Sequence, residues 1–394
     1  MKKNKKKGKI YVVIAIDTEG PIVNKKKPEI INKWSDIKKL IKILTNQDFR
    51  NYVVDSSKKG IKYSWFLLTL TGFKTNPFKR PMKYNQTFNF YKKNFFKNFN
   101  LNEDGVYWHY HQPSPSGIGN EWCKNWSDSQ EYINILNRLL IDQQFFPSCF
   151  RAGGRIEDND LSNWLEEYIP FDYSNCSGDI NWNRIESDGK RLIDVADWSK
   201  ASRSWKPYHP SKKNYQYKGS QKRHVFRCLD VNSPVYSITK GDIRQAFRQA
   251  SNGEDVVLSI FEHDRRFNVI NNLKFFLETL NEISKKFPKI KWYFKNARDA
   301  AISSQKINST SAPKFKISKL KDKRLMIETK DKIFGSRPYA CIKTSNKKYI
   351  EIPLIKVGFN KWITSQLIFK NFNFYVVANN NSGNNRPTKA LIKL

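Results

Sequence analysis

The chain has 394 residues, of which 39% are hydrophobic and 14% aromatic, and this composition excludes a disordered protein. Its 71 Lys and Arg residues outnumber 36 Asp and Glu residues and give a formal charge of +35. Apart from the N-terminal run MKKNKKKGK, the lysines are spread along the whole chain. We therefore interpret the charge as a basic surface suited to anionic membranes or anionic substrates, and we favour it over a nucleic-acid-binding groove.

The N-terminal apolar stretch IYVVIAI (10–16) has seven residues and runs straight into Asp17 and Glu19. It is too short for a signal peptide, and no other apolar run reaches the length of a membrane-spanning helix. These features predict a cytoplasmic protein, with peripheral contact to an anionic membrane as one option.

The cysteines are odd in number and form no CxxC pair, so neither a disulfide framework nor a cysteine zinc site is indicated. We expect buried free thiols at Cys123, Cys149, Cys176, Cys228 and Cys341.

Residues 9–300 alternate between short apolar runs and amphipathic stretches with helical spacing. Strands are predicted at 9–16, 62–70, 255–264 and 289–294, and helices at 35–45, 129–143, 161–168, 242–250 and 268–287. Repeated strand–helix units predict an α/β fold with a mainly parallel sheet or barrel. Functional groups are then expected at the C-terminal ends of the strands.

A second unit follows a polar segment, 301–320, which we interpret as a linker. From 321 to 394 the apolar period changes to two, and turns rich in Asn, Gly, Ser and Pro separate the apolar segments. Strands are predicted within 324–329, 339–344, 349–354, 366–370, 372–380 and 389–394. This pattern is typical of a small all-β, immunoglobulin-like sandwich. Residues 1–8 form a basic tail.

Two histidines stand one residue apart in GVYWHYHQP (105–113). A strand directs alternate side chains to one face, so His109 and His111 can both point at one metal ion while Tyr110 faces away. The alternative is that both imidazoles are hydrogen-bonded packing groups.

Acidic and imidazole groups also follow other apolar runs. Asp17 and Glu19 lie in AIDTEGP (15–21), Asp197 in DVADW (194–198) and His263 in SIFEHD (259–264). Strand ends that carry acids and imidazoles are what the catalytic mouth of a barrel requires.

Together with FRAGGR (150–155), these segments resemble the motif series of the polysaccharide deacetylase family, carbohydrate esterase family four. AIDTEGP, WHYHQP, FRAGGR, DVADW and SIFEHD stand in the usual order at plausible spacing. The resemblance covers residues 9–300 and leaves out the C-terminal β-rich unit. It implies an irregular (β/α) barrel with about seven strands.

The resemblance also implies catalytic roles. Asp17 corresponds to the general base and Arg151 to the arginine that orients it. His263 corresponds to the catalytic histidine, a general acid. Asp197 and Trp198 correspond to the acidic and aromatic pair that supports this histidine, and a neighbouring carboxylate would raise the pKa of His263.

A divalent metal, usually zinc, is the cofactor that the resemblance implies, with Glu19, His109 and His111 as its ligands. Two features depart from the family. Most members carry Asp where Glu19 stands, and in many the two histidines are four residues apart. Both departures keep the ligand chemistry and alter the geometry.

Three aromatic residues are candidates for contacting a sugar substrate: Trp198, and Trp205 and Tyr208 in WKPYHP (205–210). For the WKPYHP segment, a purely structural loop is the alternative. His209 and His224 have no partner motif.

The sequence thus predicts a metal-dependent hydrolase that removes an N-acyl group, most simply acetyl, from an amino sugar. A phosphate-bearing or lipid-linked intermediate of glycan synthesis would suit the basic charge. Hydrolysis of another C–N amide, such as a formyl group or ureide, would use the same site. A different class remains open: a non-catalytic glycan- or nucleic-acid-binding protein on a degenerate scaffold. The oligomeric state is undetermined.

Overall fold

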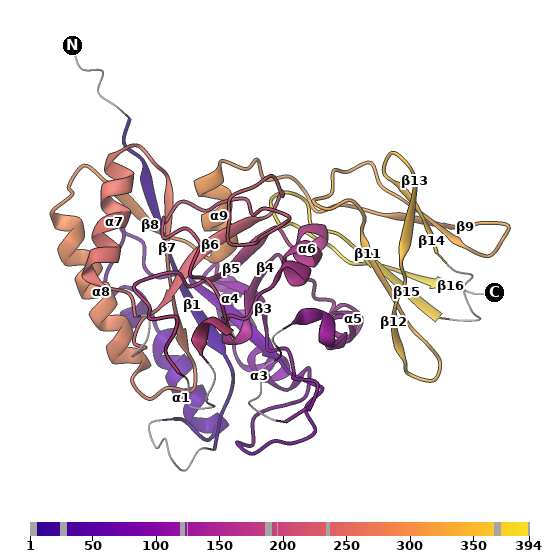
Figure 1. Ribbon diagram of the computed structural model, residues 1–394, viewed down its shortest axis with the longest axis horizontal. Helices are drawn as coiled ribbons and strands as arrows, with labels where there is room; N and C mark the ends of the chain where they lie inside the picture. Colours follow the sequence, from indigo (N-terminus) through magenta and orange to yellow (C-terminus); the bar gives the residue numbers. More distant parts are fainter. Residues whose placement is uncertain are drawn as a thin grey trace.

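The computed structural model describes residues 6–23, 30–118, 123, 125–185, 191–194, 196–233, 237–365 and 372–392. Within these residues, seven parallel strands close into a barrel (Figure 1). Each strand pairs with the next and the seventh pairs with the first: β1 (Lys9–Thr18), β2 (Tyr63–Thr69), β3 (Gly105–Tyr110), β4 (Cys149–Ala152), β5 (Phe171–Asn175), β6 (His224–Asp230) and β7 (Val256–His263). The predicted barrel of about seven strands is confirmed.

An additional strand makes the barrel irregular. β8 (Lys291–Phe294) pairs with residues 9–12 of β1, whereas β2 pairs with residues 14–18 of the same strand. On its other side β1 pairs with β7 along residues 10–17. The first strand is therefore hydrogen-bonded to three others.

Helices pack around the barrel (Figure 1). The described helices are α1 (Trp34–Leu44), α2 (Gln47–Arg50), α3 (Gln86–Asn94), α4 (Phe96–Leu101), α5 (Glu131–Gln143), α6 (Asn159–Tyr168), α7 (Lys240–Ser251), α8 (Val269–Lys285) and α9 (Ala297–Gln305). Short 3-10 turns lie at Trp126–Asp128, Gly153–Arg155 and Leu192–Asp194. The five helices predicted from periodicity correspond to α1, α5, α6, α7 and α8, with ends that differ by at most two residues.

Alternation along β1 separates two apolar cores. Its even-numbered residues 10–16 face the surrounding helices, whereas its odd-numbered residues 11–15 fill the interior of the barrel. Ala297, Ala300 and Ala301 of α9 pack into the same interior core. Because α9 follows β8 and lies where the strands begin, that end of the barrel is closed by apolar packing.

The C-terminal unit is a sandwich of two antiparallel sheets, as predicted. One described sheet has the order β13 (Leu354–Gly358), β14 (Lys361–Thr364), β10 (Leu325–Glu328), β9 (Lys316–Lys319), and the other β12 (Tyr349–Glu351), β11 (Tyr339–Lys343), β15 (Phe372–Val377), β16 (Thr388–Ile392). Side chains of both sheets share one core, including Leu325, Trp362 and Phe374. The strand predicted at 366–370 lies outside the described residues.

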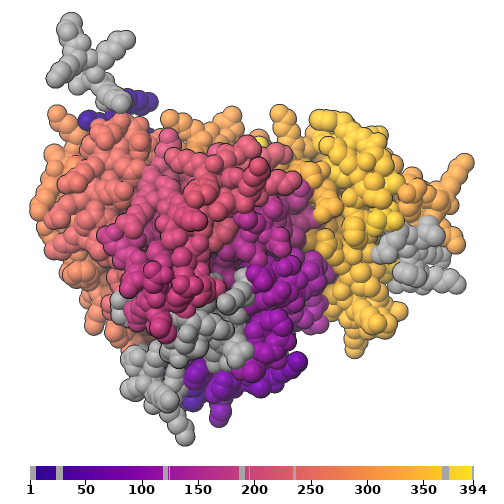
Figure 2. Space-filling view, in the orientation of Figure 1, coloured from indigo at the N-terminus to yellow at the C-terminus, as the bar shows by residue number. Residues whose placement is uncertain are grey.

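The sandwich packs against one side of the barrel (Figure 2). The Tyr339 hydroxyl donates to Asn137 Oδ1 on α5 at 2.7 Å, and the Asn379 side-chain amide donates to the carbonyls of Pro147 and Tyr168. Tyr339 and Cys341 also belong to the apolar core between the barrel and its helices. The interface therefore joins the two units through both apolar and polar contacts.

Ordered elements extend into the predicted linker from both sides, since α9 ends at Gln305 and β9 begins at Lys316. All five cysteines are buried and unpaired, as expected. Among the described residues, no helix combines the length and apolar character needed to cross a bilayer.

Candidate active site

The alternation of the strands directs polar side chains into the barrel at its C-terminal end. On β1, Asp17 continues the inward-facing series of Tyr11, Val13 and Ala15. On β3, Tyr107 faces inward, so His109, two residues later, has the same direction. The same rule applies to Arg151 after Cys149 on β4, and to His263 after Phe261 on β7, so four strands contribute to one site.

Three buried side chains form a group that could bind a metal ion. One ligand atom from each of Glu19, His109 and His111 lies within 4.8 Å of the others. The two imidazole Nε2 atoms are 3.1 Å apart, and Glu19 Oε1 lies 3.6 Å from His111 Nε2. The geometry brings together the three ligands that the sequence predicted.

The tautomer of His109 supports this assignment. Its Nδ1 lies 2.9 Å from the Arg151 carbonyl, which can only accept, so Nδ1 carries the proton and Nε2 presents a lone pair. Burial lowers the pKa of His111 to about 4, although Glu19 acts in the opposite direction, so this imidazole is neutral at pH 7. Two nitrogens bound to one tetrahedral zinc ion would be about 3.3 Å apart, close to the separation found.

Two arginines that the sequence analysis did not identify hold the other oxygen of Glu19. Arg80 Nη1 and Arg265 Nε donate to Glu19 Oε2 at 2.8 and 2.7 Å, which leaves Oε1 directed at the histidines. Burial opposes ionisation of Glu19, but Arg265, His111, His263 and Arg80 together hold its pKa well below its usual range. Glu19 therefore remains a carboxylate.

The two arginines differ in how far the sequence alone could have indicated them. Arg265 directly follows the SIFEHD segment, so its position after a motif strand could have revealed it. Arg80 lies in the connection between β2 and α3, far from any motif, and only the folded chain brings it to Glu19.

Gly153 provides the space in which the His111 ring lies. A Cβ atom at this position would meet His111 Cδ2 at 2.2 Å and Cγ at 2.3 Å. This close approach explains the need for glycine in the FRAGGR segment.

We expect Gly153→Ala to displace His111 and to weaken divalent-metal affinity by about 10- to 100-fold, the effect of disturbing a group that orients a ligand. Gly178→Ala is the matched control, because the nearest atom to its added methyl, apart from its chain neighbours, would be Arg227 Nη2 at 3.7 Å. Calorimetric titration with Zn²⁺ measures both variants; equal affinities would contradict the role given to Gly153.

Asp17 is paired with Arg151 inside the barrel. Arg151 Nε donates to both carboxylate oxygens at 2.8 Å, and Arg151 Nη1 donates to the Tyr173 carbonyl at 2.9 Å. The guanidinium also lies 3.6 Å from the centre of the Phe261 ring. These contacts fix Arg151, which in turn fixes the Asp17 carboxylate beside the predicted metal ligands.

His263 faces the cluster, with its Nε2 3.4 Å from Glu19 Oε1. Burial, and then the charges of Arg266, Arg265 and Arg151, lower the pKa of His263 well below its usual range, against the effect of Glu19. The resting imidazole is therefore neutral.

The support expected from Asp197 is not found. The Asp197 carboxylate instead accepts from Ser199 and from Gln216 Nε2, and His263 Nδ1 has no hydrogen-bond partner among the described residues. The prediction that Asp197 raises the pKa of His263 is wrong, because Asp197 closes a local turn after the 3-10 segment Leu192–Asp194.

The three predicted sugar-contacting aromatic residues are buried. Trp198 donates to the Arg155 carbonyl, and Tyr208 donates to the Tyr215 carbonyl. Trp205 accepts a backbone bond from Val257, near the start of β7, and Tyr208 pairs with Val225, near the start of β6. Trp205 and Tyr208 therefore lie toward the opposite end of the barrel, and all three are packing residues.

His209 and His224 lie at that end too, since His224 is the first residue of β6. Their ring centroids are 4.2 Å apart. They are therefore separate from the cluster of Glu19, His109 and His111.

Asp264 supports the backbone of the candidate site. It accepts from the N–H groups of Glu19 and Gly20 and from the Tyr91 hydroxyl. Burial, with the charge of Glu19 in the same direction, raises the pKa of Asp264 to about 7 despite these bonds. The folded chain therefore keeps this proton when an unfolded chain has already released it near pH 4.

We expect this difference to lower the free energy of unfolding as pH rises from about 4 to about 7, by about 2–4 kcal/mol. Asp264→Asn cannot release a proton, so its stability relative to wild type should increase over the same interval. Urea unfolding across that pH range measures the difference. Two curves that stay parallel would show that Asp264 titrates normally.

No protein-family model matches the chain, and no curated protein matches it.

Proposed function

We propose that the chain is a metal-dependent hydrolase that removes an N-acyl group, most simply acetyl, from an amino sugar. The observation that carries this proposal is the meeting of Glu19, His109 and His111 with the Asp17–Arg151 pair and His263 at the C-terminal end of the barrel. Two imidazoles and one carboxylate form a donor set that suits zinc and leaves a coordination position open for water or substrate.

A zinc ion bound there would acidify water and polarise the scissile carbonyl. Asp17, held in place by Arg151, would accept the proton from the attacking water. The leaving nitrogen must be protonated, and His263 is the nearest imidazole outside the ligand group. Because His263 starts neutral, it must gain its proton during turnover before it can donate.

The choice of an amino sugar rests on the resemblance of five short motifs to the polysaccharide deacetylase family. Two residues of these motifs, Asp197 and Trp198, do not take the places beside His263 that the resemblance implies. The catalytic and metal-binding positions of the resemblance do converge. The charge of +35 favours a substrate that carries phosphate or is held at an anionic membrane surface.

The test is a substrate screen with zinc-loaded protein. N-acetylated amino sugars are supplied free, as oligomers, as nucleotide-linked forms and as lipid-linked forms, and released acetate and free amine are measured by mass spectrometry. Protein carrying Asp17→Asn serves as the blank. We expect release from a phosphorylated or lipid-linked form.

N-formyl sugars and ureides extend the same screen. Cleavage of one of these alone would keep the amidase chemistry and replace the acyl group. A zinc-loaded protein that cleaves none of them would overturn the proposal in favour of a glycan-binding role.

A further inference from the structure

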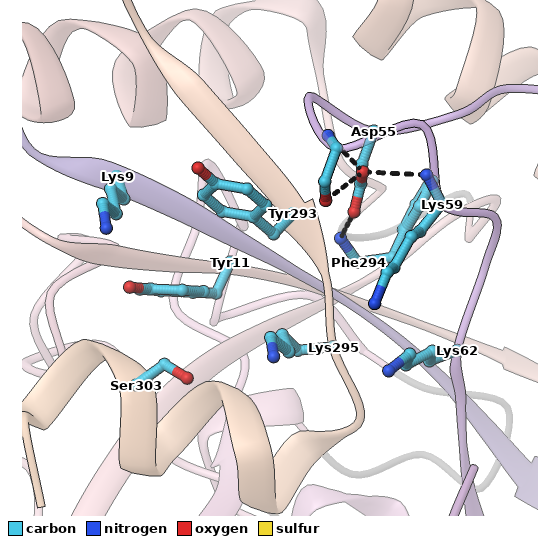
Figure 3. A pocket seen from close by; sticks show the side chains of 10 residues that line it. Lys9, Tyr11, Asp55, Lys59, Lys62, Tyr293, Phe294, Lys295 and Ser303 are labelled. Atoms are coloured by element: carbon cyan, nitrogen blue, oxygen red, sulfur yellow. Dashed lines mark hydrogen bonds between the residues drawn. The ribbon is translucent and has the colours of Figure 1, made fainter. Parts of the chain in front are cut away.

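A second pocket lies at the end of the barrel where the strands begin. It has a volume of about 330 Å³ and lies between the start of β1, the segment before β2, the end of β8 and α9 (Figure 3). Its lining residues are Lys9, Tyr11, Asp55, Ser57, Lys59, Lys62, Tyr293, Phe294, Lys295 and Ser303. Lys9 and Asp17 are the first and ninth residues of β1, so the Lys9 side of the pocket is about 26 Å from Asp17.

Four lysines from three separate segments of the chain, Lys9, Lys59 with Lys62, and Lys295, meet in this pocket. Figure 3 shows Lys59, Lys62 and Lys295 around one side and Lys9 beside the two tyrosine rings. The charges of Lys62, Lys59 and Lys295 all lower the pKa of the nearby Glu103, which places the three within electrostatic reach of one carboxylate. These lysines come together only in the folded chain.

Among the described residues, ion pairs with carboxylates engage only one of these four lysines. Glu103 pairs with Lys62, but no described carboxylate forms an ion pair with the amino group of Lys9, Lys59 or Lys295. Asp55, the one acidic lining residue, is committed to the backbone: it accepts from the N–H groups of Ser57, Lys59 and Phe294 (Figure 3). Like charges held together in this way repel one another, and an anion would relieve the repulsion.

Hydroxyl groups and an aromatic wall complete the pocket. The Tyr11 and Tyr293 rings are stacked with centroids 6.2 Å apart, and the Lys9 amino group lies 6.0 Å from the Tyr293 ring. Burial raises the pKa of Tyr11 to about 12, so its hydroxyl remains a hydrogen-bond donor at neutral pH. Ser303 on α9 adds another hydroxyl.

We propose that this pocket binds the phosphate group of a small ligand or lipid headgroup. Ammonium and hydroxyl donors suit the several acceptor oxygens of a phosphate, and the volume is that of a small-molecule site. The proposal is independent of the metal-dependent reaction, because the pocket shares no residue with the candidate active site.

The test uses inorganic pyrophosphate as the probe, titrated calorimetrically into the full chain. We expect Lys59→Gln with Lys295→Gln to weaken its binding by about tenfold or more, because each variant residue loses a charge-assisted contact. The control pair, Lys38→Gln with Lys321→Gln, removes the same charge from exposed positions outside the pocket and should leave the affinity unchanged.

A second arm distinguishes the source of the phosphate, with phosphatidylcholine vesicles that contain or lack phosphatidic acid. Cosedimentation that requires phosphatidic acid and fails in the pocket variant would identify a headgroup. Pyrophosphate binding without vesicle binding would identify a soluble phosphate ester. Equal loss in the pocket and control pairs, or no binding by wild type in either arm, would overturn the proposal. Metal content and acyl hydrolysis should be the same in both pairs.

Discussion

Replacement of His109 by Ala is expected to remove the bound metal. His109 supplies one of three donor groups, and its loss leaves Glu19 and His111 alone. We expect Zn²⁺ affinity to fall by more than about 100-fold, since even groups that only orient a ligand change affinity 10- to 100-fold. Metal per chain, measured by mass spectrometry after purification without chelators, should fall from about one to near zero.

His209→Ala is the control for this loss. His209 is an exposed imidazole at the opposite end of the barrel, and its Nδ1 contacts a backbone carbonyl as that of His109 does. Circular dichroism should show that both variants fold. Full metal content in the His109→Ala protein would contradict the ligand assignment, because a bound ion would then lie elsewhere.

The second large effect is expected for Asp17→Asn. The amide keeps the shape of the side chain but cannot accept the proton from water, so we expect acyl hydrolysis to fall by about 10²- to 10⁴-fold. The metal ligands are untouched, so metal content should stay near that of wild type. The contrast between lost activity and retained metal separates the role of Asp17 from that of His109.

Stability must be measured beside activity, because Arg151 would lose its buried carboxylate partner. Removing one member of a buried ion pair costs about 3–5 kcal/mol. Asp104→Asn is the matched control, because it also removes the carboxylate partner of a buried arginine, Arg50. Asp104 directly precedes the first residue of β3 and so lies away from the candidate site. If both variants lose similar stability and only Asp17→Asn loses activity, the carboxylate of Asp17 acts in the reaction. If both lose activity alike, Asp17 is a structural residue.

Periodicity was sufficient for much of the fold. The apolar run of 9–16 corresponds to β1, and the helical spacing of 268–287 corresponds to α8. Both signals are local, because burial of one strand or one helix face is recorded in consecutive residues. Strands β4, β5 and β6 of the barrel and β9, β13 and β14 of the sandwich were not predicted individually. All but β6 have only four or five residues, which is too short for a clear period.

The candidate site was only partly predictable. The spacing of Asp17 and Glu19, and of His109 and His111, is local and correctly indicated side chains on one side of a strand end. Asp197 and Trp198 follow the order of the resemblance, yet their positions depend on how a long connection folds. That connection turns Asp197 toward Gln216 and buries Trp198.

The sequence by itself determined which side chains alternate toward the barrel interior, because strand geometry depends on consecutive residues alone. The tertiary structure decided which of these side chains meet. Closure of the barrel placed Arg151 on Asp17, folding of distant connections placed Arg80 and Arg265 on Glu19, and the close approach of Gly153 set the His111 ring. Burial then set the neutral states of His111 and His263, since desolvation depends on surroundings that no single segment contains.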